Sequence, residues 1–194
     1  MYELRAQQFL EKQGVPSATI SRLAERQPLA AEEAARLEGF RDTAVRHLLA
    51  RHPGIPQEMI LRLSADPDEE VRWGAAGNPR TPPERLLALR VAGRYATMNE
   101  YLARNPALPV EVIVAMYRGG EANKVAFAMN PALPVELMRE IAASANDLDR
   151  TWLAANPSLP PELMERLARD EAENVRRFLK QNPAFKRRQQ GKGG

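Results

Sequence analysis

One stretch of the chain decides the fold: NPSLPPEL at residues 156–163. Its Asn-Pro step recurs along the sequence, at Asn78-Pro79, Asn105-Pro106, Asn130-Pro131 and Asn182-Pro183, and His52-Pro53 and Gln27-Pro28 continue the series backwards. The prolines of these steps are separated by 25, 26, 27, 25, 26 and 26 residues. A constant period of this length predicts a stacked repeat protein.

Each repeat reads as a pair of helices. A second proline lies three residues after most of the Asn-Pro prolines, as at Pro160, and proline is well tolerated where a helix begins. Two residues later a glutamate recurs in six repeats, at Glu33, Glu58, Glu84, Glu111, Glu136 and Glu162. A carboxylate in the first turn of a helix stabilises the positive end of the helix dipole, so we interpret this column as helix capping.

Apolar residues fill two further columns. In the first helix they are spaced three residues apart, as in Met138 and Ile141, which predicts one buried face. In the second helix an apolar residue lies four positions before the proline in six repeats, as at Leu153, and an alanine follows it in five of them. We interpret the asparagine itself as an N-cap and the Asn-Pro step as a corner of the fold rather than an active site.

The last repeats contain a distinctive set of motifs: Leu159-Pro160-Pro161-Glu162-Leu163, Leu167-Ala168 and Val175-Arg176 before Asn182-Pro183. With these residues the repeat resembles the variant leucine-rich repeat family, and the resemblance covers residues 13–185. The resemblance implies pairs of helical segments wound into a right-handed superhelix. An iron–sulfur cluster is known in this family through a cysteine cluster, but the chain has no cysteine, so no cofactor is expected.

The predicted fold is an all-α, right-handed superhelical solenoid of about six helical repeats of 25–27 residues. We expect an N-terminal helical cap and half repeat at residues 1–27, the solenoid at 28–185 and a basic, disordered tail at 186–194. The absence of cysteine and of a long apolar run favours a cytoplasmic protein that does not enter a membrane.

Charge is unevenly distributed along the chain. The formal net charge is +3, and four positive residues lie in the tail, so residues 1–185 carry −1. The repeat body therefore lacks the basic surplus of many nucleic-acid-binding proteins.

One column of the second helix is cationic in five of six repeats, at Arg46, Arg72, Lys124, Arg150 and Arg176, with Asn99 in the sixth. These side chains form either a ladder of pairs with the glutamate column or a stripe that binds a ligand. Trp73, Trp152 and Arg177 lie nearby, and Trp and Arg are frequent in binding hot spots, although such aromatic residues more often belong to the core.

The sequence favours a non-enzymatic scaffold that binds another protein. The two histidines, His47 and His52, are not part of a recognisable catalytic or metal-binding set. The alternative is a nucleic-acid-binding repeat protein that uses the cationic column and the basic C-terminal end. The sequence indicates neither the oligomeric state nor the identity of the partner.

Overall fold

The computed structural model describes residues 2–92 and 96–190, in which every regular element is an α-helix. The chain divides into two compact units, residues 1–107 and 108–194. The first contains α1 (Tyr2–Lys12), α2 (Ser17–Glu25), α3 (Ala31–Glu38), α4 (Thr43–Arg51), α5 (Gln57–Leu63), α6 (Glu69–Ala76), α7 (Pro83–Ala92) and α8 (Ala96–Arg104). The second contains α9 (Val110–Arg118), α10 (Lys124–Ala128), α11 (Val135–Ala142), α12 (Asp147–Ala154), α13 (Pro161–Leu167), α14 (Glu173–Gln181) and α15 (Pro183–Gln190).

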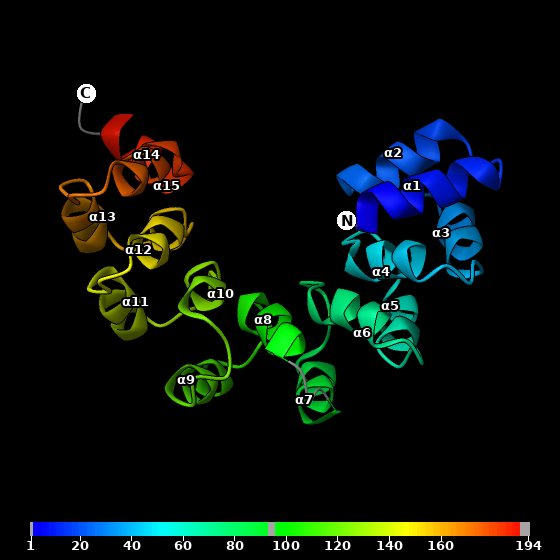
Figure 1. Cartoon of the computed structure of the whole chain (residues 1–194), viewed down its shortest axis with the longest axis horizontal. Helices are drawn as coiled ribbons and strands as arrows, with labels where there is room; N and C mark the ends of the chain where they lie inside the picture. The colour runs from blue at the N-terminus through cyan, green and yellow to red at the C-terminus, as the bar shows by residue number, and fades with distance from the viewer. Residues whose placement is uncertain (1, 93–95, 191–194) are drawn as a thin grey trace. The chain divides into compact units, whose positions relative to one another are not determined.

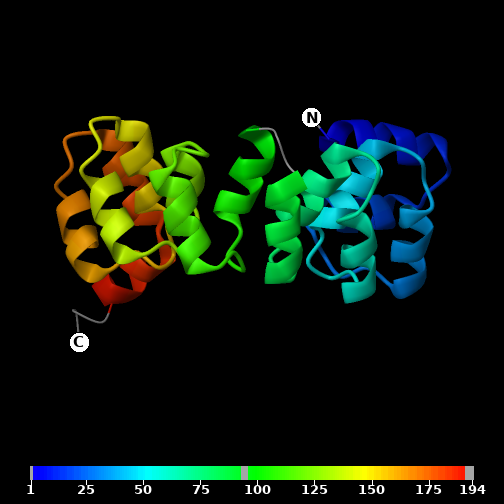
Figure 2. The same ribbon diagram turned by 90° about the horizontal axis from the view of Figure 1, so that it is seen from below.

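The described residues form six helix pairs, from α3/α4 to α13/α14, and so follow the predicted repeat. Within each unit the second helices pack on one another, α4 on α6 in the first unit and α12 on α14 in the second (Figure 1). We call this layer the second-helix row and the layer of first helices the first-helix row. Figure 2 shows the helices of each unit side by side from another direction. The all-α solenoid fold is confirmed, and its right-handed winding stays a prediction.

Local sequence explains where the helices begin. Pro56, Pro109 and Pro134 immediately precede α5, α9 and α11, as their column predicts. Second helices often begin after an Asx residue instead. The Asp42 carboxylate accepts a hydrogen bond from the N–H of Val45 at 3.1 Å, which satisfies an amide that has no acceptor inside the helix.

The predicted apolar columns are buried. Ile141 in the first-helix row and Leu153 in the second-helix row are each 0% exposed, and Phe127, which is equivalent to Leu153, is also fully buried. Within each unit the core therefore lies between the two rows and continues from repeat to repeat, because each repeat supplies one side of its neighbour's interface.

The C-terminal segment differs from the expectation. Residues 186–190, predicted to be disordered, belong to α15, and the remaining tail residues 191–194 lie outside the described residues. Arg188 of α15 donates a hydrogen bond to the Glu165 carboxylate of α13 at 2.7 Å. Phe185 is half-buried and lines the same surface depression as Met164 of α13. The pairing of Arg188 with Glu165 and the partial burial of Phe185 help to hold a helix that low hydrophobicity alone did not predict.

Leu153→Ala or Ile141→Ala should each lower the free energy of unfolding by about 2–5 kcal/mol, because each leaves a cavity in a packed column. Unfolding in urea, followed by circular dichroism, measures this loss. Leu148→Ala is the control, because that side chain is 52% exposed and should cost less than about 0.5 kcal/mol. Equal losses in the three variants would contradict the assigned core.

Candidate interaction surface

The asparagine of the Asn-Pro step is buried and connects its repeat to the preceding one. The Nδ2 atom of Asn156 donates to the carbonyl oxygens of Ala128 and Asn130, at 2.7 and 2.9 Å. Its Oδ1 atom accepts from the N–H of Ser158 at 2.8 Å. We call the two bonds from Nδ2 the cross-repeat amide bonds. They occupy carbonyl groups where a second helix ends and has no further intrahelical donors.

The same two donor bonds recur at other steps: Asn78 to Ala50 and His52, Asn105 to Ala76 and Asn78, and Asn182 to Ala154 and Asn156. His52 takes the asparagine position of its repeat, where its Nδ1 accepts from the N–H of Gly54 and its Nε2 donates to the Gln27 carbonyl oxygen at 2.8 Å. A helix begins directly after Asn182, where the predicted capping role is correct. At Asn78 and Asn156 the side chain closes a turn and connects two repeats instead.

Two arginines of the cationic column pair with aspartates. Arg150 binds the Asp170 carboxylate with Nε at 2.7 Å and Nη2 at 3.0 Å, and both side chains are 8% exposed. Arg46 binds Asp66 in the same way, at 3.0 and 3.3 Å. Each aspartate lies 20 residues further along the chain, in the next repeat, so these guanidinium groups hold neighbouring repeats together.

Electrostatics at the buried pair follows from its geometry. The hydrogen bond to Asp170 raises the pKa of Arg150 above its usual value. Burial by itself raises the pKa of Asp170, but hydrogen bonds from Arg150 and from the N–H of Ala172 outweigh burial and hold that pKa below its usual range. Both groups therefore stay charged at neutral pH.

The remaining cations of the candidate set differ in accessibility. Arg72 and Arg176 are half-buried, and Nη1 of each donates to two backbone carbonyl oxygens in the loop before its own helix. Lys124 and Arg177 are exposed. Exposed cations are available to a partner, whereas Arg46 and Arg150 are engaged within the fold.

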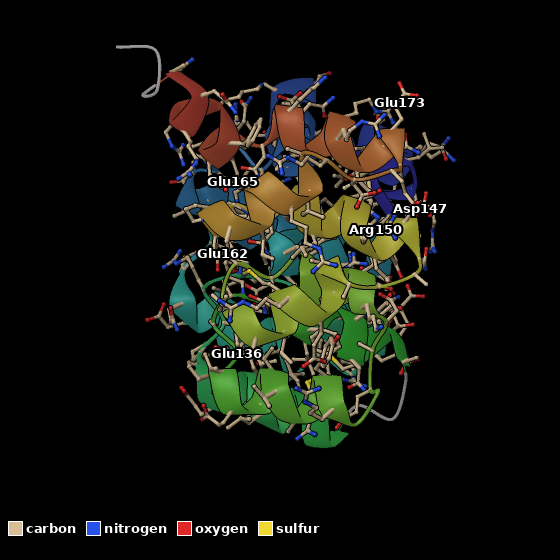
Figure 3. All side chains as sticks on the ribbon, turned by 90° about the vertical axis from the view of Figure 1, so that its left-hand side faces the viewer. Glu136, Asp147, Arg150, Glu162, Glu165 and Glu173 are labelled. Atoms are coloured by element: carbon tan, nitrogen blue, oxygen red, sulfur yellow. The ribbon has the colours of Figure 1, made fainter. Side chains whose placement is uncertain are left out.

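Of the two alternatives for the cationic column, the ladder with the glutamate column is contradicted at Arg46 and Arg150, which pair with aspartates instead. Figure 3 shows Glu136 and Glu162 at the opposite side of the stack from Arg150. Glu162 instead pairs with Arg139 of the first-helix row at 3.1 Å. The capping interpretation is supported at Glu33, which accepts from the N–H of Ala30 at the start of α3.

Glu33 also contacts α2. Its carboxylate accepts a hydrogen bond from the Thr19 hydroxyl at 2.5 Å and pairs with Arg22. The bond from Thr19, followed by those from the N–H of Ala30 and from Arg22, lowers the pKa of Glu33 to about 2. This carboxylate therefore joins the first turn of α3 to the N-terminal helices.

Three apolar side chains gather on the second-helix row of the second unit, and we call them the aromatic edge: Leu148, Trp152 and Phe178. The rings of Trp152 and Phe178 meet edge to face, with centroids 5.7 Å apart and planes at 72°. Leu148 lies one helical turn before Trp152 and is 52% exposed. The Arg177 guanidinium carbon lies 5.7 Å from the Phe178 ring centroid. The edge thus combines aromatic, aliphatic and cationic groups at the surface.

The first unit has an aromatic cluster on its second-helix row. Tyr2 of α1 stacks on His47 of α4 with centroids 4.0 Å apart, and His47 meets Tyr101 of α8 at 6.0 Å. The guanidinium carbon of Arg51 lies 5.7 Å from the Tyr101 ring centroid. Gly74 of α6 lies at this point, and a Cβ atom there would be 2.5 Å from the His47 carbonyl oxygen. Glycine therefore allows α4 and α6 to approach closely. Trp73 is half-buried on the same helix.

Burial controls ionisation in this cluster. The Nδ1–H of His47 donates to the Glu70 carbonyl oxygen at 2.5 Å, whereas its Nε2 atom is buried and lacks a hydrogen-bond partner among the described residues. Burial lowers the pKa of His47 and raises that of Tyr2 to about 12. The neutral forms of both rings are therefore favoured in the folded protein.

Sequence reasoning missed the aspartates and the amide bonds. Asp66 and Asp170 occupy a column that contains Arg118 and Ser144 in other repeats, so no consistent residue type marks it. The asparagine column was conspicuous, but the carbonyl groups that it binds leave no signature in a sequence.

In the part of the chain that the structure describes, no group of three His, Asp or Glu residues is arranged to hold a metal ion. No helix in that part is long and apolar enough to cross a membrane.

Asn156→Asp should lower the free energy of unfolding by about 2–5 kcal/mol at pH 7, because a carboxylate cannot donate to the two buried carbonyl oxygens. Part of the loss should be recovered in acid, where the protonated carboxyl can donate one bond. Urea unfolding at pH 7 and pH 5 tests this. Asn146→Asp is the matched control, because Asn146 only accepts from the N–H of Leu148, which aspartate can also do. Equal losses in the two variants would contradict a role for the amide donors.

His47 should make the protein less stable as pH falls. A folded-state pKa below the unfolded value of about 6.5 contributes stability above pH 6.5, and that contribution is lost as the pH falls toward the folded value. His47→Asn keeps a donor for the Glu70 carbonyl but removes the titration, so the slope of unfolding free energy between pH 6.5 and 5 should decrease. His52, whose pKa is also lowered by burial, contributes to the remaining slope. An unchanged slope in His47→Asn would disprove the assignment.

Comparison with known families agrees with this architecture. Residues 43–68 match the leucine rich repeat variant family, and residues 122–183 match the leucine rich repeat variant domain. The two matched segments lie in different units. The segment at 43–68 contains α4 and the aspartate that pairs with it, and the segment at 122–183 contains three second helices and the Asn-Pro steps that follow them. No curated protein and no solved structure gave a significant match. Together with the six helix pairs, these matches support the similarity of the chain to the variant leucine-rich repeat family.

Proposed function

We propose that the chain is a non-enzymatic scaffold that binds another protein through its second-helix row. The recurring polar residues with the most distinctive chemistry, the buried asparagines and the Arg–Asp pairs, are engaged in joining repeats. Repeat families of this kind present an extended surface that no single repeat provides. A cytoplasmic location remains the prediction from sequence.

The observation that carries this proposal is the aromatic edge with Arg177 beside it. Trp152 and Phe178 are half-buried, and Leu148 has more than half of its surface exposed, although each is large and apolar. Aromatic and arginine side chains contribute a large share of the binding free energy at protein interfaces. Of the predicted candidates, Trp152 and Arg177 lie at this edge, and Lys124 is an exposed cation of the same unit.

Nucleic-acid binding is the second candidate. It is favoured by the cations of α14 and α15, because Arg177, Lys180, Lys186 and Arg187 are exposed and no acidic residue follows Glu173 in the sequence. It is weakened by the engagement of Arg46 and Arg150 within the fold. Binding through this end would give a slope of log affinity against log salt of about −0.9 per neutralised phosphate, which titration of a labelled oligonucleotide measures.

The protein-binding proposal is tested by affinity capture from nuclease-treated extract of the source cells. Leu148→Glu should reduce recovery of the specific partner at least about tenfold, because it places a charge in the aromatic edge. The matched control is Leu61→Glu on α5, where an exposed leucine lies in the first-helix row. Equal recovery with both variants would reject the aromatic edge, and the absence of any partner that survives nuclease treatment would reject the scaffold proposal.

A further inference from the structure

Among the described residues, α14 is the last helix of the second-helix row, and its outer face differs in composition from the equivalent face of α12. Thr151 and Ala154 of α12 are 5% and 0% exposed, and the equivalent residues of α4, His47 and Ala50, lie where α6 packs on α4, since a Cβ atom on Gly74 would meet both. The equivalent positions of α14, 26 residues later, are Arg177 and Lys180, and both are exposed. The helix face on which the next second helix would pack is thus neutral at α12 and cationic at α14.

The surface of α14 is hollowed at these residues. A depression of about 350 Å³ is lined by Glu173, Arg176, Arg177, Lys180 and Gln181. These residues recur at intervals of three and four along α14, which places them on one face of the helix. The depression therefore lies among side chains of α14 alone and extends along its exposed face.

The aromatic edge adjoins this face. Arg177 lines the depression and also lies over the Phe178 ring, which packs against Trp152. An occupant of the depression would therefore meet cations along α14 and apolar rings at one side. The charges and the rings together indicate an occupant with both acidic and apolar residues.

We propose that α14 docks an acidic, amphipathic α-helix of a partner protein, which packs on it as the next second helix of the row would. This inference rests on the proposed scaffold function and specifies the site and the chemistry of the partner. The packing of α14 on α12 provides the geometry, and Arg177 and Lys180 provide the charge.

A role as a polar end cap explains the composition of the α14 face less fully than a docking role does. Terminal repeats need a polar outer face for solubility, which residues of either charge would provide. Here the two positions equivalent to Thr151 and Ala154 both carry cations, and one of them, Arg177, lies over the half-buried ring of Phe178. Nucleic acid is the less favoured occupant, because Lys186 and Arg187, which would extend a phosphate-binding path, lie on α15 outside the depression.

The test selects ligands from a displayed library of helix-forming peptides about 18 residues long, in which Glu, Lys, Gln, Leu and Ala vary. Enriched peptides should carry net negative charge and an apolar stripe. Binding is then measured in Trp73→Phe protein, so that Trp152 is the only fluorophore of its kind. Saturable change in Trp152 emission is expected, because the peptide would lie beside the aromatic edge.

Arg177→Glu/Lys180→Glu should weaken the selected peptides at least about tenfold. Lys186→Glu/Arg187→Glu is the matched control, with the same change in net charge on α15, and should change affinity less than about twofold. Circular dichroism confirms that both variants fold, since all four side chains are exposed.

Three outcomes would overturn the proposal. Peptides that bind both double variants equally well would place the ligand elsewhere and leave the scaffold function standing. A library that yields only neutral or basic sequences, or none, would reject an acidic helix at α14, whatever the capture experiment gives. Displacement of the peptides by single-stranded oligonucleotide, with equal losses in both variants, would indicate a general polyanion surface.

Discussion

The cross-repeat amide bonds are the interaction on which the rest of the fold depends. A helix ends with carbonyl groups that have no intrahelical donors, and in a stack of short helices many such ends are buried. Asparagine satisfies them because one neutral amide supplies two donors and an acceptor. At Asn156 the two donors join two repeats and the acceptor fixes the turn before the next helix. A charged or shorter side chain could not make all three bonds.

A second set of contacts lies at the other end of the second helices. Arg150, near the start of α12, reaches Asp170 before α14, whereas Asn182 follows the end of α14 and reaches back to Ala154 and Asn156. Helices α12 and α14 are therefore connected near both of their ends, with the apolar column that includes Leu153 between them. This arrangement explains why the row keeps its register although each helix is only a few turns long, since short helices are not stable by themselves.

The sequence predicted the elements whose cause is local or periodic. Proline positions marked helix starts, and the spacing of Ile141 and Leu153 identified the core, because burial on one helix face imposes a period. It did not predict that Asn156 binds backbone carbonyls of another repeat, since carbonyl groups are the same in every residue. The pairing of Arg150 with Asp170 was also missed, because a glutamate column offered a more regular partner. The aromatic edge was recognised only in part: Trp152 and Arg177 were candidates, whereas Leu148 was not.

The same structural position serves two purposes in this chain. In α12, Thr151 and Ala154 are neutral and buried, and a charge at either position would be buried without a partner. In α14 the backbone has the same geometry, but Arg177 and Lys180 remain hydrated. Removing these charges would leave a face that resembles the one on α12, and a helix from a second copy could then pack on it. A neutral helix on this face would bury the two cations without partners, which costs free energy, whereas an acidic helix would pair with them. Selectivity of this face for an acidic helix therefore follows from the cost of burying an unpaired charge.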